Sequence, residues 1–262
     1  SGYTFTGWTG SNGTTAQKSV TITKGNTGNR SYTANWTPTN YTISYNANGG
    51  SLSGQKTSYN VNTDSFTLPT PTKNGYTFTG WTGSNGTTAQ KSVTIAKGST
   101  GNKSYTANWT PVNYTISYNA NGGSLSGQKT SYNIETANFT LPQPTRSGYT
   151  FTGWTGTGLS SATKSVTVSK GSTGNRSYTA NWSANGYTVS FNYNKPSTAT
   201  GTMSGNGTTS KGVTYATAYG TLPQPSIPGW AFNGWYTAAS GGSGISATTT
   251  YTAVGNQTLY AH

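Results

Sequence analysis

The sequence predicts a mainly β protein built as a tandem array of modules of about 73 residues. Three observations support this fold class. The heptapeptide Gly2–Trp8 recurs at Gly75–Trp81 and Gly148–Trp154, a constant step of 73 residues. Aromatic and β-branched residues accompany 36 Gly and 10 Pro, which is typical of short strands joined by tight turns. Segments in which apolar residues alternate with Thr and Ser recur in every copy, as in half-buried strands.

The repeat sets the domain boundaries, because its unit begins at Tyr-Thr-(Ile/Val)-Ser and closes at the Trp of Tyr-Thr-Ala-Asn-Trp, which stands at 36, 109 and 182. We expect the C-terminal part of a truncated repeat at 1–39, repeat modules at 40–112 and 113–185, and a repeat module with an eight-residue insertion at 186–262. The chain starts inside a repeat and without a signal peptide, as expected for a segment of a longer protein. The fragment 1–39 is expected to be less stable than a whole module unless it packs on its neighbour.

Elements can be assigned in order within residues 113–185. Residues 114–118 alternate Tyr or Ile with Thr or Ser and predict the first strand. Asn-Gly-Gly at 121–123 predicts the following turn, since Asn and Gly tolerate positive φ. Residues 124–138 leave a strand, a short helical turn or both open. Leu-Pro-Gln-Pro at 141–144 predicts a rigid crossing loop, because proline does not fit a helix interior or a central strand.

The second half of the module is predicted to form three more strands. Alternation predicts one at 149–152, a short one at 166–168 and a final one at 178–182. Gly153 is expected to mark a bulge or a close backbone approach before Trp154. Aromatic rings should fill the small core. Six tryptophans at two repeat positions are assigned mainly to it: Trp8, Trp81, Trp154, Trp36, Trp109 and Trp182. Short linkers, two of them with proline, predict an elongated rod.

The formal net charge of +13 comes from 15 basic residues against two acidic ones and favours contact with polyanions. The basic residues recur with the repeat, so they could present a stripe that binds an anionic polymer through many weak contacts. The alternative is that duplicated modules duplicate a solvated surface, and no aromatic interleaving typical of nucleic-acid sites accompanies the lysines. The candidate contact residues are Lys18, Lys24, Arg30, Lys91, Lys97, Lys103, Lys164, Lys170 and Arg176.

Catalysis and metal binding are not expected. The chain has no Cys, a single His at position 262, and two carboxylates, Asp64 and Glu135, that do not recur in other copies. Acid–base pairs, Ser-His-Asp sites and His/carboxylate metal clusters all need more such groups. We therefore expect no enzyme activity and no cofactor. No apolar run approaches the roughly 20 residues that cross a bilayer, so no membrane insertion is expected.

Several anchors in fixed order carry a family resemblance. Tyr-Thr-Ile-Ser-Tyr-Asn-Ala-Asn-Gly-Gly stands at 41–50 and 114–123, and Leu-Pro-x-Pro, Gly-Tyr-Thr-Phe-x-Gly-Trp and a closing aromatic-x-Ala-x-Trp follow it. This order resembles the Listeria–Bacteroides repeat, also known as the internalin B B-repeat, over essentially the whole chain. The fourth copy, from Gly220 to Ala261, is especially similar to the family consensus.

The resemblance implies small α+β, β-grasp-like modules in tandem on secreted or wall-attached proteins of Gram-positive and some other bacteria. It implies an extracellular structural or adhesive segment, a stalk or spacer that serves host, matrix or cell–cell contact. The alternative is a module that binds a polyanion or glycan through its repeated basic face, with exposed aromatics stacking on sugars. Expected partners are an anionic polymer, a glycan, a host surface protein, or further copies assembling into fibres. The chain departs from its relatives in its scarcity of acidic residues.

Overall fold

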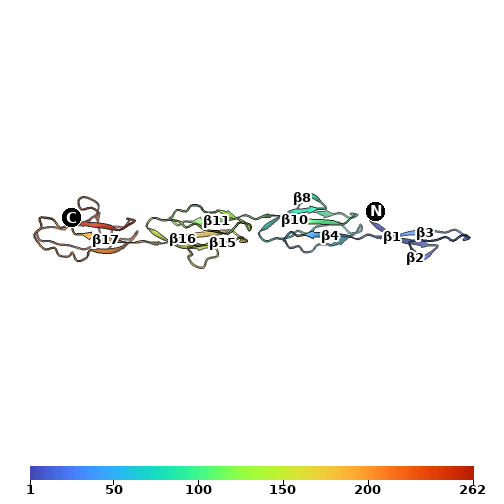
Figure 1. Ribbon diagram of the computed structural model, residues 1–262, viewed down its shortest axis with the longest axis horizontal. Coiled ribbons are helices and arrows are strands. Elements are labelled where there is room, and N and C mark those ends of the chain that lie inside the picture. The colour runs from blue at the N-terminus through green and yellow to red at the C-terminus, as the bar shows by residue number, and fades with distance from the viewer. The chain divides into compact units, whose positions relative to one another are not determined.

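The structure, a computed structural model, describes residues 1–262 and contains β-strands without any helix (Figure 1). The chain divides into two compact units. One comprises Ser1–Asn113 with Asn133–Glu135, and the other comprises Tyr114–Tyr132 with Thr136–His262. The prediction of a mainly β protein is confirmed, whereas the helical part of the expected α+β module is not found.

The first unit begins with a small three-stranded sheet in the order β2-β1-β3. Its strands are β1 (Tyr3–Gly10), β2 (Gly13–Gln17) and β3 (Tyr32–Pro38). β1 and β3 run antiparallel, and Tyr3 faces Pro38 at one end of the pair. No strand covers the outer edge of β3, so Trp8 and Trp36 are 37% and 58% exposed. The expectation that these two tryptophans lie in a core is wrong for this copy, because the strands that would cover them are not part of this sheet.

The first unit continues with the strands β4 to β10, between Tyr41 and Pro111. A five-stranded sheet has the order β5-β4-β10-β7-β8, and β6 pairs with β9 beside it. The first and last long strands, β4 and β10, are parallel neighbours, and β7 lies antiparallel on the other side of β10. The strands are β4 (Tyr41–Asn46), β5 (Ser58–Tyr59), β6 (Phe66–Thr67), β7 (Tyr76–Gly83), β8 (Gly86–Gln90), β9 (Thr94–Ile95) and β10 (Lys103–Pro111).

The second unit opens with the same arrangement, in the sheet order β12-β11-β16-β14 with β13 and β15 paired beside it. No strand follows β14 at the position of β8. Gly-Leu-Ser-Ser at 158–161 replaces the Asn-Gly turn of the preceding copy, and a single bridge joins Trp154 to Thr163. The strands are β11 (Tyr114–Asn119), β12 (Ser131–Tyr132), β13 (Phe139–Thr140), β14 (Tyr149–Gly156), β15 (Thr167–Val168) and β16 (Arg176–Ala184).

The last module forms a sheet in the order β18-β17-β21-β19-β20. The extra residues of this copy lie between β17 and β18, where residues 193–209 form a long loop. The strands are β17 (Gly186–Asn192), β18 (Ser210–Thr214), β19 (Trp235–Tyr236), β20 (Gly244–Ile245) and β21 (Gln257–Ala261).

Most of the local predictions for residues 113–185 are confirmed. The turn after β11 has positive φ at Asn121 (50°) and Gly122 (82°). The pairing of β14 with β16 shifts register between Phe151 and Gly153, which is the expected bulge. The uncertain stretch 124–138 contains the two-residue strand β12 and no helical turn, and residues 141–144 form a loop without strand pairing.

Each complete module closes a core of its own. Trp81, Trp154 and Trp235 occupy one repeat position and are at most 2% exposed. Tyrosine, leucine, isoleucine and valine side chains of the same module pack around them, from the first and last strands and from the segments between these strands. No polar or charged residue is buried. Aromatic and aliphatic burial therefore stabilises each module without a disulfide or a buried ion pair.

The tyrosines of these cores predict a loss of stability at alkaline pH. Burial, and then the neighbouring phenols, raise the pKa of Tyr45, Tyr105 and Tyr118 above the usual value near 10. A tyrosine whose pKa is raised in the folded state contributes its full stability below its unfolded-state pKa of about 10. This contribution to the free energy of unfolding is lost as the pH rises through the folded-state pKa, because ionisation favours the unfolded chain. We expect the urea concentration at the unfolding midpoint, measured by circular dichroism, to decrease as the pH is raised above about 10. An unchanged midpoint over that range would contradict this.

Candidate functional site

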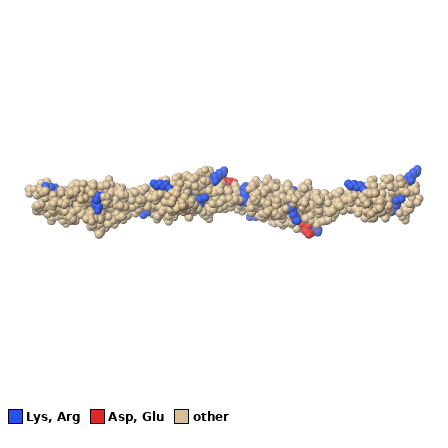
Figure 2. All heavy atoms as spheres, turned by 90° about the horizontal axis from the view of Figure 1, so that it is seen from below, with Lys and Arg blue, Asp and Glu red and all other residues tan.

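The nine predicted polyanion contacts differ in exposure. Seven are exposed in loops or just beyond strand ends, whereas Lys103 and Arg176 are half-buried at the starts of β10 and β16. On the face shown in Figure 2, basic side chains are dispersed over the surface and do not merge into one continuous patch. The exposed seven are Lys18, Lys24, Arg30, Lys91, Lys97, Lys164 and Lys170.

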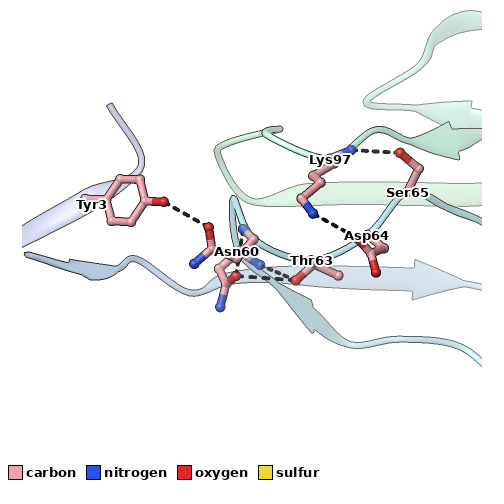
Figure 3. A network of polar contacts seen from close by, with 7 residues as sticks. Tyr3, Asn60, Thr63, Asp64, Ser65 and Lys97 are labelled. Atoms are coloured by element: carbon pink, nitrogen blue, oxygen red, sulfur yellow. Dashed lines mark hydrogen bonds and ion pairs between the residues drawn. The ribbon is translucent and has the colours of Figure 1, made fainter.

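The positive charge is almost uncompensated. Lys97 Nζ lies 2.9 Å from Asp64 Oδ1 in the single ion pair of the chain (Figure 3). The hydrogen bond and the charge of Lys97 lower the pKa of the Asp64 carboxyl. Both side chains are well exposed, so water and salt screen this pair. The other basic side chains have no carboxylate partner, and each unit therefore has a positive surface potential.

Some basic side chains serve the fold instead of a free surface. Arg176 Nε donates to the Tyr132 hydroxyl at 2.9 Å, and its Nη1 lies 3.4 Å from the Tyr178 hydroxyl. Lys73 Nζ donates to the Asn48 carbonyl at 3.1 Å and lies 4.2 Å from the centre of the Tyr76 ring. Arg146 repeats the role of Lys73 one module later. The sequence pattern alone does not separate these residues from the solvated lysines.

The groups that could support acid–base chemistry have separate partners. Asp64 pairs with Lys97, and Glu135 Oε1 accepts a hydrogen bond of 2.9 Å from the Tyr76 hydroxyl. The His262 ring stacks on Tyr236 at 4.0 Å, and its Nε2 lies 2.9 Å from the Ala238 carbonyl oxygen. No group of three His, Cys, Asp or Glu residues comes together. The arrangement presents no acid and base toward a shared substrate position.

The last module contains a cavity of about 180 Å³ lined by Tyr193, Trp230 and Phe232 among others. Part of its lining lies at repeat positions that pack against a tryptophan in the preceding copies. In the module 40–112, Trp109 packs edge-on against Phe78 at 5.5 Å, at the position of Phe232 in the last module. The cavity thus lies at the repeat position that Trp109 occupies in that earlier copy.

A contact between repeat copies is the feature that the sequence analysis missed. The Tyr3 hydroxyl donates to Asn62 Oδ1 at 2.9 Å, so the start of β1 meets the 60–63 turn of the following copy (Figure 3). A Cβ atom at Gly2 would overlap the Val61 side chain, so glycine is required there for the close approach. The Thr39 amide donates to the Gly2 carbonyl at 2.9 Å and fixes the linker beside the same glycine.

The same Gly-Tyr contact recurs at the later copies. In the first unit, a Cβ atom at Gly75 would lie 2.5 Å from Ile134, and Tyr76 bonds Glu135. In the second unit, Gly148 has the same relation to Tyr215, whose ring meets Tyr149 edge-on at 5.3 Å. The fixed Gly-Tyr pair was visible as a repeat, but its partner residues vary in type, so spacing alone did not reveal the contact.

The structure contains no helix that is long and apolar enough to cross a lipid bilayer. The family model of the Listeria-Bacteroides repeat domain matches residues 41–108, 114–180 and 187–262, and that of the divergent InlB B-repeat domain matches residues 1–40. A protein of Evansella cellulosilytica, named as a Gly-rich membrane protein, is 29% identical over 243 residues, which cover 90% of this chain and 26% of that protein. The chain thus spans about a quarter of the length of this relative. No solved structure matches the chain.

Proposed function

The chain belongs to the Listeria–Bacteroides repeat family, which is typical of bacterial surface proteins, and on that premise we propose that it is an extracellular stalk or spacer segment. The observation that carries the proposal is the repeated construction: each complete module closes its own core, and the same Gly-Tyr contact joins one copy to the next. Such a segment places whatever it bears at a distance from the cell. It holds no catalytic arrangement of side chains.

The modules proposed are those of the sequence repeat: 40–112, 113–185 and 186–262, preceded by the partial copy 1–39. The first and last strands of each are parallel neighbours in a mixed sheet, and this pairing supports the proposed β-grasp-like arrangement of the strands. Short linkers, two of them with proline, are the reason for proposing an elongated rod. Small-angle scattering tests this, because a rod gains equal increments of maximum dimension with each added module.

The location is tested on intact cells of a bacterium that expresses the full-length protein. We expect an antibody raised against residues 113–185 to label unbroken cells, and external protease to remove the epitope while a cytoplasmic marker survives. Labelling that needs cell lysis would overturn the surface assignment.

Adhesion is the second candidate function, and the uncompensated basic surface favours an anionic polymer as its ligand. If the charge acts diffusely, heparin retention is expected to disappear well below about 0.3 M salt, because counterion release makes such binding steeply salt-dependent. Lys91→Gln and Lys129→Gln should then weaken retention equally, since each removes one charge. Retention that survives about 0.3 M salt and depends on Lys91 but not on Lys129 would identify a dedicated site.

A further inference from the structure

The path of the chain through each module puts its two ends on neighbouring parallel strands. Chain entry is at the first strand and exit is at the last, which are β4 and β10 in the first complete module (Figure 1). Their register runs from Ile43 beside Lys103 to Asn46 beside Thr106. The pairs β11–β16 and β17–β21 repeat this arrangement in the other modules.

In the module 113–185, side-chain hydrogen bonds join the segments of β11 and β16 beyond both ends of their backbone hydrogen-bond ladder. At its start, the Thr115 amide donates to Asn175 Oδ1 at 3.0 Å. At its end, Asn121 Nδ2 donates to the Ala180 carbonyl at 3.1 Å, and Trp182 Nε1 donates to the Ala120 carbonyl at 3.1 Å. The first strand with its turn and the last strand are thus joined along their whole overlap.

Tension applied through the chain ends acts on this pair in one particular direction. It pulls the beginning of the first strand and the end of the last strand apart along the strand axis, because the two strands are parallel. The backbone hydrogen bonds then share the load and must break together, whereas a pair pulled open from one end loses its bonds one at a time. We propose that each complete module is a force-bearing unit whose first and last strands form the load-bearing pair. This rests on the proposed stalk function for its purpose, since a stalk is loaded through its ends.

The partial copy offers a contrast within the same chain. β1 and β3 are antiparallel, and Tyr3 and Pro38 are partners beside the two ends of the fragment. Pulling at residues 2 and 39 therefore separates this pair from one end. The fragment is expected to extend at low force without a discrete rupture.

Single-molecule stretching of the whole 262-residue chain between its termini tests the proposal. We expect three discrete unfolding events, each lengthening the chain by roughly 220 Å, which is the extended length of a module less its folded span. The chain has no cysteine, so thiol handles can be placed singly without interference. Smooth extension at low force, with no discrete events, would overturn the proposal.

Two matched variants separate the load-bearing pair from general stability. Asn175 and Asn138 are exposed, lie in the same module, and each accept one backbone amide, from Thr115 at 3.0 Å and from Lys170 at 2.7 Å. Only the Asn175 bond joins the first strand to the last. At constant load, Asn175→Ala is expected to speed the unfolding of its module about fivefold, and Asn138→Ala to leave it unchanged. Equal acceleration by both variants would contradict the assignment.

Changing the direction of pull provides an independent test. Handles at residue 1 and at Thr173→Cys load residues 113–185 through the starts of β11 and β16, which lie side by side. This module should then open at much lower force, while the module 40–112 in the same chain keeps its rupture force. Equal forces for the two modules would overturn the proposal. Each of these results is independent of where the protein resides in the cell, so the surface assignment can fail while the mechanical one holds.

Discussion

Trp154→Ala is expected to lower the free energy of unfolding of residues 113–185 by about 3–5 kcal/mol. The indole is completely buried and meets Phe151 and Tyr118 edge-on at 5.5 and 5.7 Å. Its Nε1 donates to the Pro142 carbonyl at 3.3 Å, so truncation leaves both a cavity and an unsatisfied acceptor. A domain of this size has only about 4–11 kcal/mol in total, so the module should be close to unfolding at room temperature.

Trp8 supplies the matched control, because it occupies the same repeat position in an identical heptapeptide. It is 37% exposed in the partial copy, so Trp8→Ala should cost about 1 kcal/mol or less. Urea unfolding of both variants, with amide exchange resolved by residue, gives the comparison. Loss of protection should be confined to residues 113–185 in Trp154→Ala. A similar cost at both positions would show that burial is not the cause.

Gly153→Ala is the second substitution with a large expected effect, a loss of about 3 kcal/mol in the same module. Gly153 has φ of 144° at the bulge of β14, a conformation that L side chains rarely adopt. A Cβ atom there would lie 2.5 Å from the Thr163 amide nitrogen and 2.7 Å from the Ala162 carbonyl carbon. Both are backbone atoms, so the strand and the bridge beside it would have to move.

Gly158→Ala is the control for the backbone conformation alone. Gly158 also has positive φ, 76°, but no atom lies within 4 Å of the position of its Cβ. We expect it to cost about 1 kcal/mol, measured as the shift in the urea midpoint at constant slope. If Gly158→Ala were as harmful as Gly153→Ala, steric overlap at the bulge would not be the cause.

Local pattern predicted much of the fold. Alternation at 114–118 and 149–152 located β11 and β14, and the Asn-Gly-Gly turn and the bulge at Gly153 followed from the conformations that these residues accept. The parallel pairing of β11 with β16 was not predicted, because it joins segments about 60 residues apart and alternation does not encode partners. Short strands such as β12 and β13 could not be predicted, because two residues are too few to show an alternation of apolar and polar side chains.

The candidate surface was predicted by composition and only partly by position. Recurrence identified the basic residues, but Lys97 and Lys24 have the same repeat spacing, and only Lys97 has a carboxylate within reach. Likewise, Arg176 lies at the repeat position of Arg30, yet Tyr132 and Tyr178 engage its guanidinium. These differences depend on tertiary neighbours that are not adjacent in the sequence.

The enclosure of each core within its own module has a genetic consequence. Gain or loss of one whole repeat copy would lengthen or shorten the protein by about 73 residues. Because no core is shared between modules, an added copy brings all the residues needed to bury its own equivalent of Trp81 or Trp154. A deletion likewise leaves the core tryptophans of the neighbouring copies buried. Variants of the protein that differ in copy number should therefore all fold, and if the proposed stalk function holds, the length of the stalk would change in increments of one module.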